Sequence, residues 1–360
     1  MTRIRELIAV VALASGALGA AAGTSGADPE VAHDRGATPP GAASNIITIS
    51  AVGDMIFGNT PNLPPDPSHY LDAVDGSITA GAQIRFANLE GTLTTVSQSK
   101  CPPRSTECFA FRNPPSYARI FAADGFTVLN DANNHSHDFG DAGQQQTVRA
   151  IHHAGMAQTG LPGEITIVPA GTHKIAMVAF APYTYDASLL DLSAAKALIQ
   201  KARTEARVVI VYMHAGAEGS DKTHVTGREE YAFGEDRGNP KRFAHMAIRN
   251  GASLVIASGP HVLRGMEFCR GHLIAYSLGN FANFHNFGGG GILSESAILH
   301  VTLTSTGGFV TGQLQSVVLD SEGHPTMGGS SISTVRSLST EDFGAHAARL
   351  GNSGVIRKPA

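Results

Sequence analysis

The stretch that decides the fold is Ile46-Ile47-Thr48-Ile49-Ser50-Ala51-Val52-Gly53-Asp54. A nearly unbroken apolar run of this length is typical of a strand that is buried on both faces, as strands of parallel sheets are. The run stops at a glycine and is followed by an aspartate, so a carboxylate stands where the strand ends. We therefore predict a strand over Ile46–Val52 within an α/β sheet, with Asp54 at its carboxyl end.

The same pattern returns along the chain, with helical stretches between the apolar runs. Six further strands are predicted at Ile84–Asn88, Thr127–Asn130, Lys174–Phe180, Val208–Met213, Ser253–Ala257 and His272–Tyr276. Apolar residues at helical spacing predict helices at Pro115–Ala123, Ala142–Ala154, Ala194–Ala206 and Asn239–Asn250. After Asn283, the segments Ala297–Thr304 and Phe309–Leu319 predict an antiparallel pair. Strands that alternate with helices define an α/β fold.

The beginning of the chain has a different character. Arg3 and Arg5 precede a short apolar run from Leu7 to Leu18, and small residues follow it. This layout predicts a secretory signal peptide over residues 1–27, with an uncleaved membrane anchor as the alternative. The protein is therefore expected to be secreted or to lie in the extracytoplasmic cell envelope, or else to be anchored to the membrane by this segment.

The rest of the chain divides into three predicted parts. Residues 28–44 are rich in Ala, Gly and Pro without periodicity, so they are interpreted as a flexible linker. Residues 45–320 carry all the predicted strands and helices and form one domain. Residues 321–360 are rich in Ser, Gly and Thr and are expected to form a loose C-terminal tail.

Composition narrows the class of protein. Of the 360 residues 42% are hydrophobic and 16% are charged, and the net charge is -4. These values exclude a collagen, a coiled coil and a disordered acidic tail, and they indicate a globular protein. No nucleic-acid partner is expected, because the chain has no basic excess to neutralise phosphates.

The three cysteines indicate a disulfide if the protein is exported, because disulfides persist in oxidising compartments. Cys101 and Cys108 flank a turn-rich stretch that is able to close a small loop. We favour this bridge, with Cys269 left as a buried thiol, although three cysteines allow three pairings.

Polar side chains follow five of the predicted strands at the point where each strand ends. These endings are Gly53-Asp54, Asn88-Leu89-Glu90, Asn130 to Asp138, Met213-His214 and Ser258-Gly259-Pro260-His261. Ligands of α/β sheets bind beyond the carboxyl ends of the strands, so these side chains are expected to lie close together. Carboxylate, amide and imidazole donors suit Mn, Fe or Zn rather than Ca or Mg. Taken singly, each residue has a plainer explanation as a turn cap, an ion-pair partner or a hydrogen-bonded core histidine.

The motifs together resemble a known family. They are Gly53-Asp54, Asn88-Leu89-Glu90, Asn133-Asn134-His135 with Asp138 and Gly140, His214-Ala215-Gly216-Ala217-Glu218, Gly259-Pro260-His261-Val262 and Tyr276-Ser277-Leu278-Gly279-Asn280-Phe281. In order and spacing they resemble the CapA family of poly-γ-glutamate capsule biosynthesis proteins, a branch of the calcineurin-like metallophosphoesterase superfamily. The resemblance runs from about Ile46 to Phe284 and implies a four-layer α/β/β/α sandwich of the metallophosphoesterase type.

The resemblance also implies a site. Its metal ligands would be Asp54, Glu90, Asn134, His214 and His261, and His135 would be the catalytic imidazole that donates a proton or stabilises developing charge. Supporting residues would be Asn88, Asn133, Asp138, Glu218 and Asn280. The implied cofactor is one or two divalent ions, with Mn, Fe or Zn favoured.

Two departures from the superfamily pattern bear on the number of ions. The histidine usual two residues after the first aspartate is Ile56 here, and Ser258 and Gly259 stand where a further histidine is usual. One firmly held metal ion fits this donor set better than two. The departures also leave open whether the protein is an enzyme.

Three functions follow as hypotheses. The first is an exported protein that takes part in the biosynthesis, transport or release of poly-γ-glutamate or a related envelope polymer, with a metal-dependent hydrolase or transferase site. Its partners would be the polymer or its precursors and membrane-bound capsule synthesis proteins. The second is a non-catalytic polymer-handling or assembly subunit with a degraded metal site. The third is a phosphoesterase of small phosphorylated molecules, for which Arg112 and Arg264 are candidate anion-binding residues.

Overall fold

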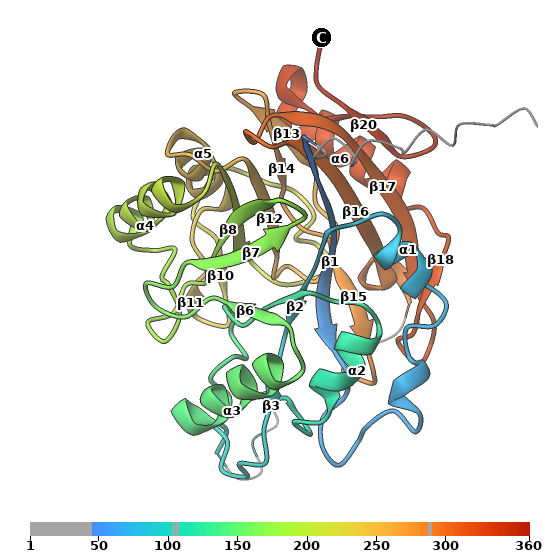
Figure 1. Cartoon of the computed structure of the whole chain (residues 1–360). Coiled ribbons are helices and arrows are strands. Elements are labelled where there is room, and N and C mark those ends of the chain that lie inside the picture. The colour runs from blue at the N-terminus through green and yellow to red at the C-terminus, as the bar shows by residue number, and fades with distance from the viewer. Residues whose placement is uncertain (1–44, 103–104, 106–107, 287–289) are drawn as a thin grey trace, which may run out of the picture. The chain divides into compact units, whose positions relative to one another are not determined.

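Two β-sheets dominate the computed structural model, which describes residues 45–102, 105, 108–286 and 290–360 (Figure 1). The larger sheet has ten strands and the smaller has six. The larger contains, in spatial order, β19 (Arg349–Leu350), β20 (Val355–Arg357), β17 (Phe309–Leu319), β16 (Glu295–Thr304), β1 (Ile46–Ile56), β2 (Ile84–Leu89), β5 (Val128–Asn130) and β6 (Ala157–Thr159). Beside this path, β15 (Asn280–Asn283) pairs with β1 and β18 (Pro325–Met327) pairs with β17. The predicted signal peptide (1–27) and linker (28–44) lie outside the described residues.

The smaller sheet contains, in spatial order, β13 (Met266–Cys269), β14 (His272–Ala275), β12 (Leu254–Ser258), β9 (Val208–His214), β8 (His173–Phe180) and β7 (Thr166–Ala170). Two short pairs complete the strands, β3 (Thr92–Leu93) with β4 (Arg112–Asn113) and β10 (Tyr231–Ala232) with β11 (Glu235–Asp236). The helices are α1 (Asp75–Thr79), α2 (Tyr117–Ala123), α3 (Gly140–His153), α4 (Leu192–Glu205), α5 (Pro240–Arg249) and α6 (Ser331–Phe343), with 3₁₀ turns at Pro67–His69, Gly291–Ser294 and Gly344–His346.

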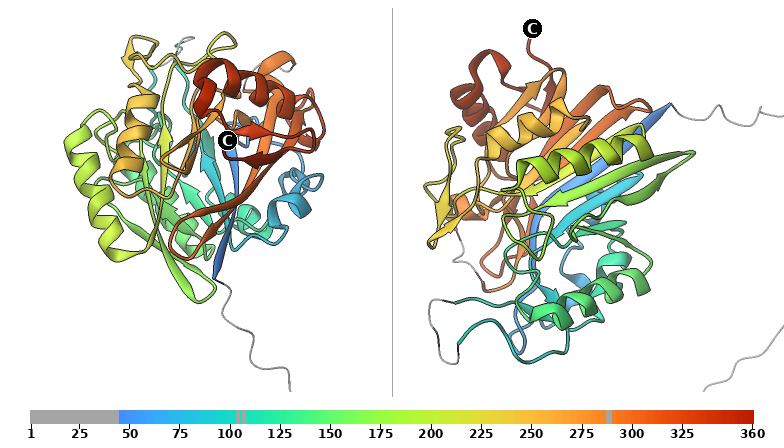
Figure 2. Two further views of the ribbon diagram at one scale, coloured as in Figure 1. Left: turned by 90° about the horizontal axis from the view of Figure 1, so that it is seen from above. Right: turned by 90° about the vertical axis from the view of Figure 1, so that its left-hand side faces the viewer.

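The elements stack in four layers, as expected from the sequence. One core lies between the two sheets and includes Ile49 of β1, Phe86 of β2 and Ile210 of β9. A second lies between the smaller sheet and α4 and α5, and a third between the larger sheet and α1, α2 and α3. The right-hand view of Figure 2 shows this order, with α4 and α5 at one side of the paired sheets and α2 and α3 at the other. The fold is an α/β sandwich.

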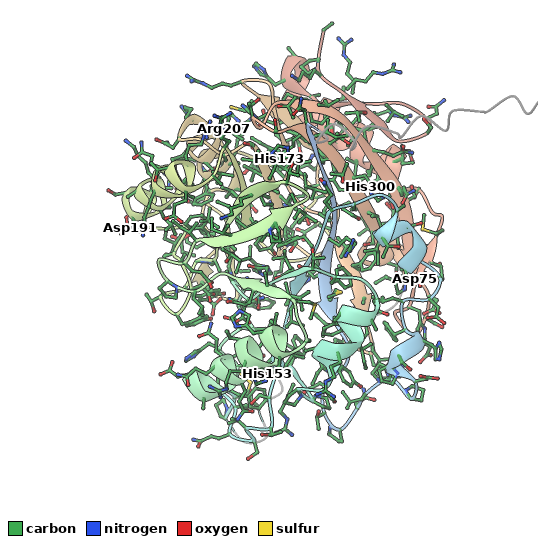
Figure 3. The ribbon with its side chains drawn as sticks, in the orientation of Figure 1. Asp75, His153, His173, Asp191, Arg207 and His300 are labelled. Carbon is green, nitrogen blue, oxygen red and sulfur yellow. A yellow bond between two sulfur atoms is a disulfide. The ribbon has the colours of Figure 1, made fainter. Side chains whose placement is uncertain are left out.

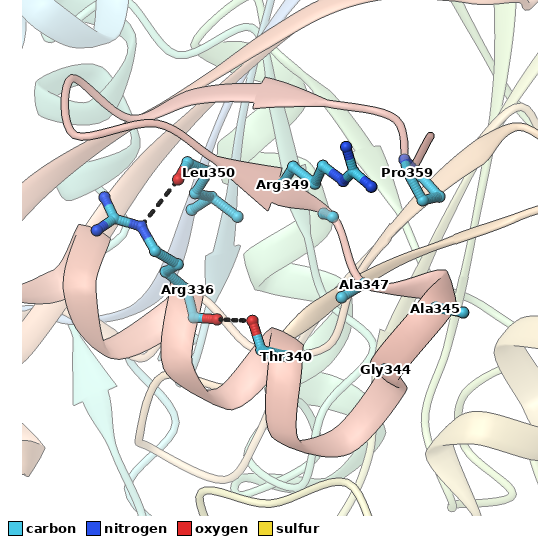
Figure 4. Close-up of a pocket in the computed structure, with 9 residues that line it drawn as sticks. Arg336, Thr340, Gly344, Ala345, Ala347, Arg349, Leu350 and Pro359 are labelled. Atoms are coloured by element: carbon cyan, nitrogen blue, oxygen red, sulfur yellow. Dashed lines mark hydrogen bonds between the residues drawn. The ribbon is translucent and has the colours of Figure 1, made fainter.

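Residues 321–360 do not form the loose tail that their composition predicted. They contain β18, α6, β19 and β20, and α6 buries Val335, Leu338 and Phe343. Figure 4 shows the contact of this segment with itself: Arg336 Nε donates to the carbonyl of Leu350 at 2.8 Å beside a cavity of about 310 Å³. The prediction failed because a Ser- and Thr-rich helix has weak periodicity, while burial against the sheets supplies the stability that propensity does not.

The registers of the strands bring the predicted side chains to one edge. Asp54 in β1 stands opposite Asn88 in β2, and Asn88 stands opposite Asn130 in β5. In the smaller sheet His214 at the end of β9 stands opposite Ser258 at the end of β12. Because β1, β2 and β5 are parallel, as are β9 and β12, all these residues lie at the carboxyl ends of their strands.

Candidate metal centre

The two sheets meet at Asp54. Its Oδ1 accepts hydrogen bonds from Asn88 Nδ2 at 2.7 Å and from the hydroxyl of Ser258, which belongs to the opposite sheet. Asn88 is held in turn by Asn130 Nδ2, which donates to Asn88 Oδ1 at 2.6 Å. This chain of amides fixes one oxygen of Asp54 and directs the other, Oδ2, toward His261, whose Nδ1 lies 3.4 Å away.

A close backbone approach explains why a glycine precedes Asp54. A Cβ on Gly53 would lie 1.9 Å from the carbonyl oxygen of Gly279, so no larger residue fits at that position. The backbone N–H of Asp54 donates to that same carbonyl at 3.0 Å. The Gly53-Asp54 motif therefore packs directly against the backbone of the Leu278-Gly279-Asn280 motif. This contact sets the position of Asp54.

Three acidic and imidazole side chains converge on one point. Ligand atoms of Asp54, Glu90 and His261 all lie within 4.8 Å of one another, and all three residues are buried. His261 Nε2 lies 3.5 Å from Glu90 Oε1. These three were predicted from the resemblance as metal ligands, and the structure brings them together.

The loop after β12 orients His261. This residue has φ of +60°, in the left-handed region that non-glycine residues seldom occupy. Its Nδ1 lies 2.9 Å from Asn280 Oδ1, and Asn280 Nδ2 donates to the His261 carbonyl at 3.2 Å. Asn280 thus contacts both the ring and the backbone of His261, and hydrogen-bond partners of this kind orient metal-binding imidazoles.

His214 and Asn134 lie next to residues of this cluster. His214 Nε2 is 3.8 Å from Glu90 Oε1, and its ring is positioned by Tyr212, whose hydroxyl lies 3.3 Å from His214 Nδ1. Asn134 Nδ2 donates to Glu218 Oε1 at 3.3 Å. Glu90 Oε1 therefore lies near both imidazoles, His261 Nε2 and His214 Nε2, and Asn134 contacts the cluster through Glu218.

Burial and mutual charge set the ionisation of these groups. Burial raises the pKa of Glu90 well above its ordinary value and lowers the pKa of His214 to about 3, so His214 stays neutral. Burial also acts to raise the pKa of Asp54, but His261 outweighs it and the net pKa is lowered. For His261 burial acts to lower the pKa, yet Glu90, Asp54 and Glu218 together raise it well above 6.5. The carboxylates of this cluster therefore favour a positive charge among them, as the raised pKa of His261 indicates.

The donor set fits a divalent metal ion. Both carboxylate oxygens of Glu90, the Oδ1 of Asn134 and the Nε2 of His214 are buried and have no hydrogen-bond partner among the described residues. A buried carboxylate without a partner is costly, and coordination of a cation is the usual compensation. Carboxylate, amide and imidazole donors at one strand edge therefore fit a cation such as Mn, Fe or Zn.

His135 lies beside this centre and is held by a second carboxylate. Its Nδ1 lies 2.8 Å from Asp138 Oδ2, and the ring packs against Phe111. Lys100 Nζ pairs with the other oxygen, Asp138 Oδ1, at 2.7 Å. Asn133 places the loop, because its Nδ2 donates to the Leu89 carbonyl and its Oδ1 accepts from the His135 N–H.

A cavity of about 520 Å³ opens next to the centre. Its lining includes Asn134, His135, Glu218, Arg237, Phe109 and Phe233. Phe109 and Phe233 are 57% and 80% exposed, so they form an apolar rim at its entrance. Its volume lies within the range of small-molecule sites, about 300–1,000 Å³.

Several residues considered from the sequence lie elsewhere or act differently. Ile56, where a histidine is usual, is a buried apolar residue of β1, and Ser258 holds Asp54 instead of supplying a ligand. Arg264 is not available to bind an anionic ligand, because it is fully buried and its Nη2 pairs with Glu230 Oε2 at 2.7 Å. Arg112 donates to the Val96 carbonyl at 2.8 Å. Figure 3 labels His153, His173 and His300, which lie on α3, β8 and β16 outside the cluster.

The cysteines behave largely as expected. Cys101 and Cys108 form the disulfide that the sequence favoured. Cys269 is free, but it is half-buried at the end of β13 rather than fully buried.

The sequence missed three residues of the site. Tyr212 shares a strand face with His214, and this spacing of two is the signal that was available for it. Asn130 was quoted only as part of a loop, although it is the residue that fixes Asn88. Arg237 pairs with Glu218 at 2.7 Å across a long excursion of the chain, and no local pattern marks it.

These features agree with the comparison to protein families. Residues 48–285, about two thirds of the chain, match the model of the family described as bacterial capsule synthesis protein PGA_cap. The chain belongs to this family.

Two curated relatives share less than a third of their aligned residues with the chain. The chain is 29% identical over 174 residues to the PGA biosynthesis protein CapA of Bacillus subtilis (strain 168) and 29% identical over 180 residues to the capsule biosynthesis protein CapA of Bacillus anthracis. These alignments cover 43% and 44% of this chain and 42% and 40% of the relatives, so the chain matches less than half the length of each of these two proteins.

Solved structures resemble the chain more loosely. A hypothetical protein from Thermus thermophilus aligns with TM-score 0.44 and 14% identity, over 75% of this chain and 98% of that one. The 5'-nucleotidase precursor from the same organism aligns with TM-score 0.43 and 10% identity, over 83% of this chain and 59% of that one. Within the described residues, every helix is too short or too polar to span a bilayer.

Proposed function

We propose that the chain is an exported protein of the cell envelope that acts on poly-γ-glutamate or a related capsule polymer by metal-dependent hydrolysis or transfer. The observation that carries this proposal is the convergence of Asp54, Glu90 and His261. Next to them lies a cavity whose lining includes Asn134, His135 and Glu218, and Glu218 Oε2 is 3.6 Å from His261 Nε2. Family membership and the names of the two Bacillus relatives support a capsule polymer as the substrate.

The chemistry follows from the arrangement of the side chains. A divalent ion held by Asp54, Glu90 and His261 would polarise the attacked group and activate a water molecule. His135, with Nδ1 fixed by Asp138, offers Nε2 to protonate the leaving group, and an imidazole suits this role near neutral pH. Phe109 and Phe233, which line the cavity, would contact the apolar parts of a polymer chain that enters it.

The location and partners are part of the proposal. The charged and apolar pattern of residues 1–27 supports export, or anchoring by an uncleaved segment. The partners would then be the envelope polymer or its precursors and membrane-bound capsule synthesis proteins. No nucleic-acid partner is proposed, because the chain carries a net charge of -4.

The test compares wild-type protein with Asp54→Ala. Both are assayed with added Mn²⁺ for release of γ-glutamyl fragments from poly-γ-glutamate and for hydrolysis of bis(p-nitrophenyl) phosphate, after metal content has been measured. We expect wild type to retain a divalent ion and cleave one of these substrates, and Asp54→Ala to lose both properties. Equal activity of the two proteins, or wild type that retains no ion, would contradict the enzymatic proposal.

A second candidate is a non-catalytic polymer-handling or assembly subunit. The observation that favours it is the loss of imidazole donors at Ile56 and at Ser258-Gly259. In that case wild type and Asp54→Ala would bind poly-γ-glutamate equally well, and neither would cleave it.

A further inference from the structure

The backbone at Gly259 does not favour an imidazole. A Cβ built there would lie 3.1 Å from the backbone nitrogen of Ala215 and 3.3 Å from Nε2 and Cδ2 of His214, and Gly259 has φ of +119°. The residue at the other departure, Ile56, is apolar and 1% exposed. Neither Ile56 nor Gly259 supplies a metal ligand. Any further donor to the candidate centre therefore comes from another part of the chain.

Glu218 reaches the centre from the loop that follows β9. Its Oε2 lies 3.6 Å from His261 Nε2, nearly the same distance as the 3.5 Å that separates Glu90 Oε1 from that nitrogen. The side chain is largely buried. Two carboxylate oxygens, from Glu90 and Glu218, therefore face the same imidazole nitrogen from different elements.

The other oxygen of Glu218 is fixed. Oε1 accepts a hydrogen bond from Asn134 Nδ2 at 3.3 Å and pairs with Arg237 Nη1 at 2.7 Å. Arg237 is itself held, because its Nη2 pairs with Glu235 at 3.1 Å and its guanidinium lies over the Tyr183 ring. This network leaves Oε2 as the oxygen that Glu218 presents to the centre.

We propose that Glu218 is a direct ligand of the metal ion, through Oε2, and that it replaces the imidazole donors which this chain lacks. The inference rests on the metal-dependent function proposed above. The centre then has three carboxylates, from Asp54, Glu90 and Glu218, around the imidazole of His261. A donor set this rich in carboxylate oxygen favours Mn²⁺ or Mg²⁺ over Zn²⁺ relative to an imidazole-rich set. Arg237 is a positioning residue that orients Glu218 and offsets part of the negative charge.

The chain offers a matched control, because Glu218 and Glu235 both pair with Arg237. We would titrate metal-free wild type, Glu218→Gln and Glu235→Gln with Mn²⁺ and with Zn²⁺ in a calorimeter. Loss of a residue that only orients a ligand weakens metal binding by about 10- to 100-fold, so loss of a ligand should weaken Mn²⁺ binding by at least about 100-fold. Glu235→Gln should stay within about threefold of wild type, because Glu218 keeps its bond to Arg237. The loss should be larger for Mn²⁺ than for Zn²⁺.

The outcomes separate this inference from the proposed function. If wild type binds Mn²⁺ and Glu218→Gln binds it equally well, Glu218 is not a ligand and the metal-dependent function stands. If both variants lose affinity equally, the effect belongs to Arg237 and the inference is wrong. If wild type binds neither ion, the metal-dependent function fails as well. Thermal melting of the metal-free proteins verifies folding; should Glu218→Gln not fold, Glu218→Asp keeps the charge but withdraws the oxygen, and unchanged Mn²⁺ affinity in that variant would overturn the inference.

Discussion

Two groups of buried carboxyl side chains lie near the carboxyl ends of strands in this protein, and Asp54 in the first group differs from Asp131 in the second in the direction of its pKa shift. The first group is the candidate metal centre of Asp54, Glu90, His214 and His261. The second, which we name the acid pair, is Asp131 after β5 and Asp186 after β8. Asp131 and Asp186 are 0% and 2% exposed, and both oxygens of Asp131 have no hydrogen-bond partner among the described residues.

The difference lies in the partners that each group meets. Asp54 faces His261, and its pKa is lowered in spite of burial. In the acid pair, burial and then the neighbouring Asp186 raise the pKa of Asp131 well above its ordinary value. The hydrogen bonds that Asp186 accepts from described residues come from neutral groups, among them Ser136 Oγ at 3.1 Å and Gln144 Nε2 at 3.3 Å, and burial raises its pKa too. Burial thus raises the pKa of Glu90, Asp131 and Asp186, whereas the hydrogen bond and charge of His261 lower the pKa of Asp54. Glu90 differs from the acid pair because its Oε1 lies 3.5 Å from the imidazole of His261.

The largest effect is expected when the central carboxylate is neutralised. Glu90→Gln removes the carboxylate that lies beside both His261 and His214, so the variant should retain no Mn²⁺ and show no metal-dependent cleavage. Thermal melting gives a direct measure. At a Mn²⁺ concentration 100 times the dissociation constant, wild type should gain about 2.7 kcal/mol of stability, and Glu90→Gln should gain none.

The matched control for this variant is Asp131→Asn, which also neutralises a buried carboxyl group at a strand end. It should keep the Mn²⁺-dependent gain in full. A loss of that gain in Asp131→Asn would mean that the acid pair, and not the metal centre, binds the ion.

His135→Ala should separate catalysis from metal binding. Removing a positioned acid–base group typically lowers the rate about 10²- to 10⁴-fold, so kcat should fall by this factor while Mn²⁺ affinity stays unchanged. The control is His137→Ala, since His137 lies in the same loop but pairs with Asp141 and stacks on Tyr185. Equal losses in the two variants would show that the loop, rather than the imidazole of His135, is what matters.

The acid pair predicts a distinctive pH dependence of stability. Burial and the neighbouring Asp186 raise the pKa of Asp131 well above 3.8 in the folded state, whereas in the unfolded chain the group loses its proton above that value. Unfolding then releases a proton, so stability is highest below that value and falls by about 1.4 kcal/mol per pH unit for each such group, until the folded pKa is reached. Urea denaturation between pH 5 and 8, with EDTA present, measures this slope.

Asp131→Asn should reduce that slope and should be more stable than wild type at pH 8. Asp66→Asn, which changes an exposed carboxylate, should leave the slope as it is. Identical slopes in wild type and Asp131→Asn would mean that Asp131 is ionised in the folded protein and that the contrast with Asp54 is wrong.

The smallest effect is expected at the rim of the cavity. Phe233 lines the cavity but is mostly exposed, so Phe233→Ala should raise KM for poly-γ-glutamate about three- to tenfold, equivalent to about 0.7–1.4 kcal/mol of binding, and leave kcat unchanged. Tyr231→Ala is the control, because Tyr231 is on the same hairpin and 61% exposed but does not line the cavity. An unchanged KM in Phe233→Ala would place the substrate elsewhere.

The buried strands of the fold could be predicted from the sequence because they are continuous apolar runs. Strands β1, β8 and β9 begin and end within four residues of their predicted limits. The segment after residue 320 could not, because its helix buries Ser331 and Ser339 together with Val335, and such a pattern has no strong period. Tertiary packing, not local propensity, makes that helix stable.

The candidate site was predictable to the extent that strand ends and motifs mark it. Asp54 and Glu90 lie at the carboxyl ends of neighbouring parallel strands, so their proximity follows from the register of one sheet. His261 follows β12 of the other sheet and reaches them because the two sheets pack together. Sequence motifs do not predict which way each loop side chain points. Asp131 and Asn134 are close together in one motif, yet Asp131 lies beside Asp186 and Asn134 contacts Glu218. The direction of a loop side chain depends on its contacts, as with the bonds of Asn133 to Leu89 and His135, and no spacing rule supplies these. Arg237 could not be predicted either, because its pairing with Glu218 depends on the path of a loop and not on a local sequence pattern.

The most direct test of the central claim is anomalous X-ray diffraction from crystals soaked in MnCl₂, recorded at the manganese absorption edge. We predict a peak within about 2.5 Å of ligand atoms from Asp54, Glu90 and His261, and none beside Asp131 and Asp186. The absence of a peak at Glu90, or a peak only at the acid pair, would contradict the assignment of this strand edge as a metal centre.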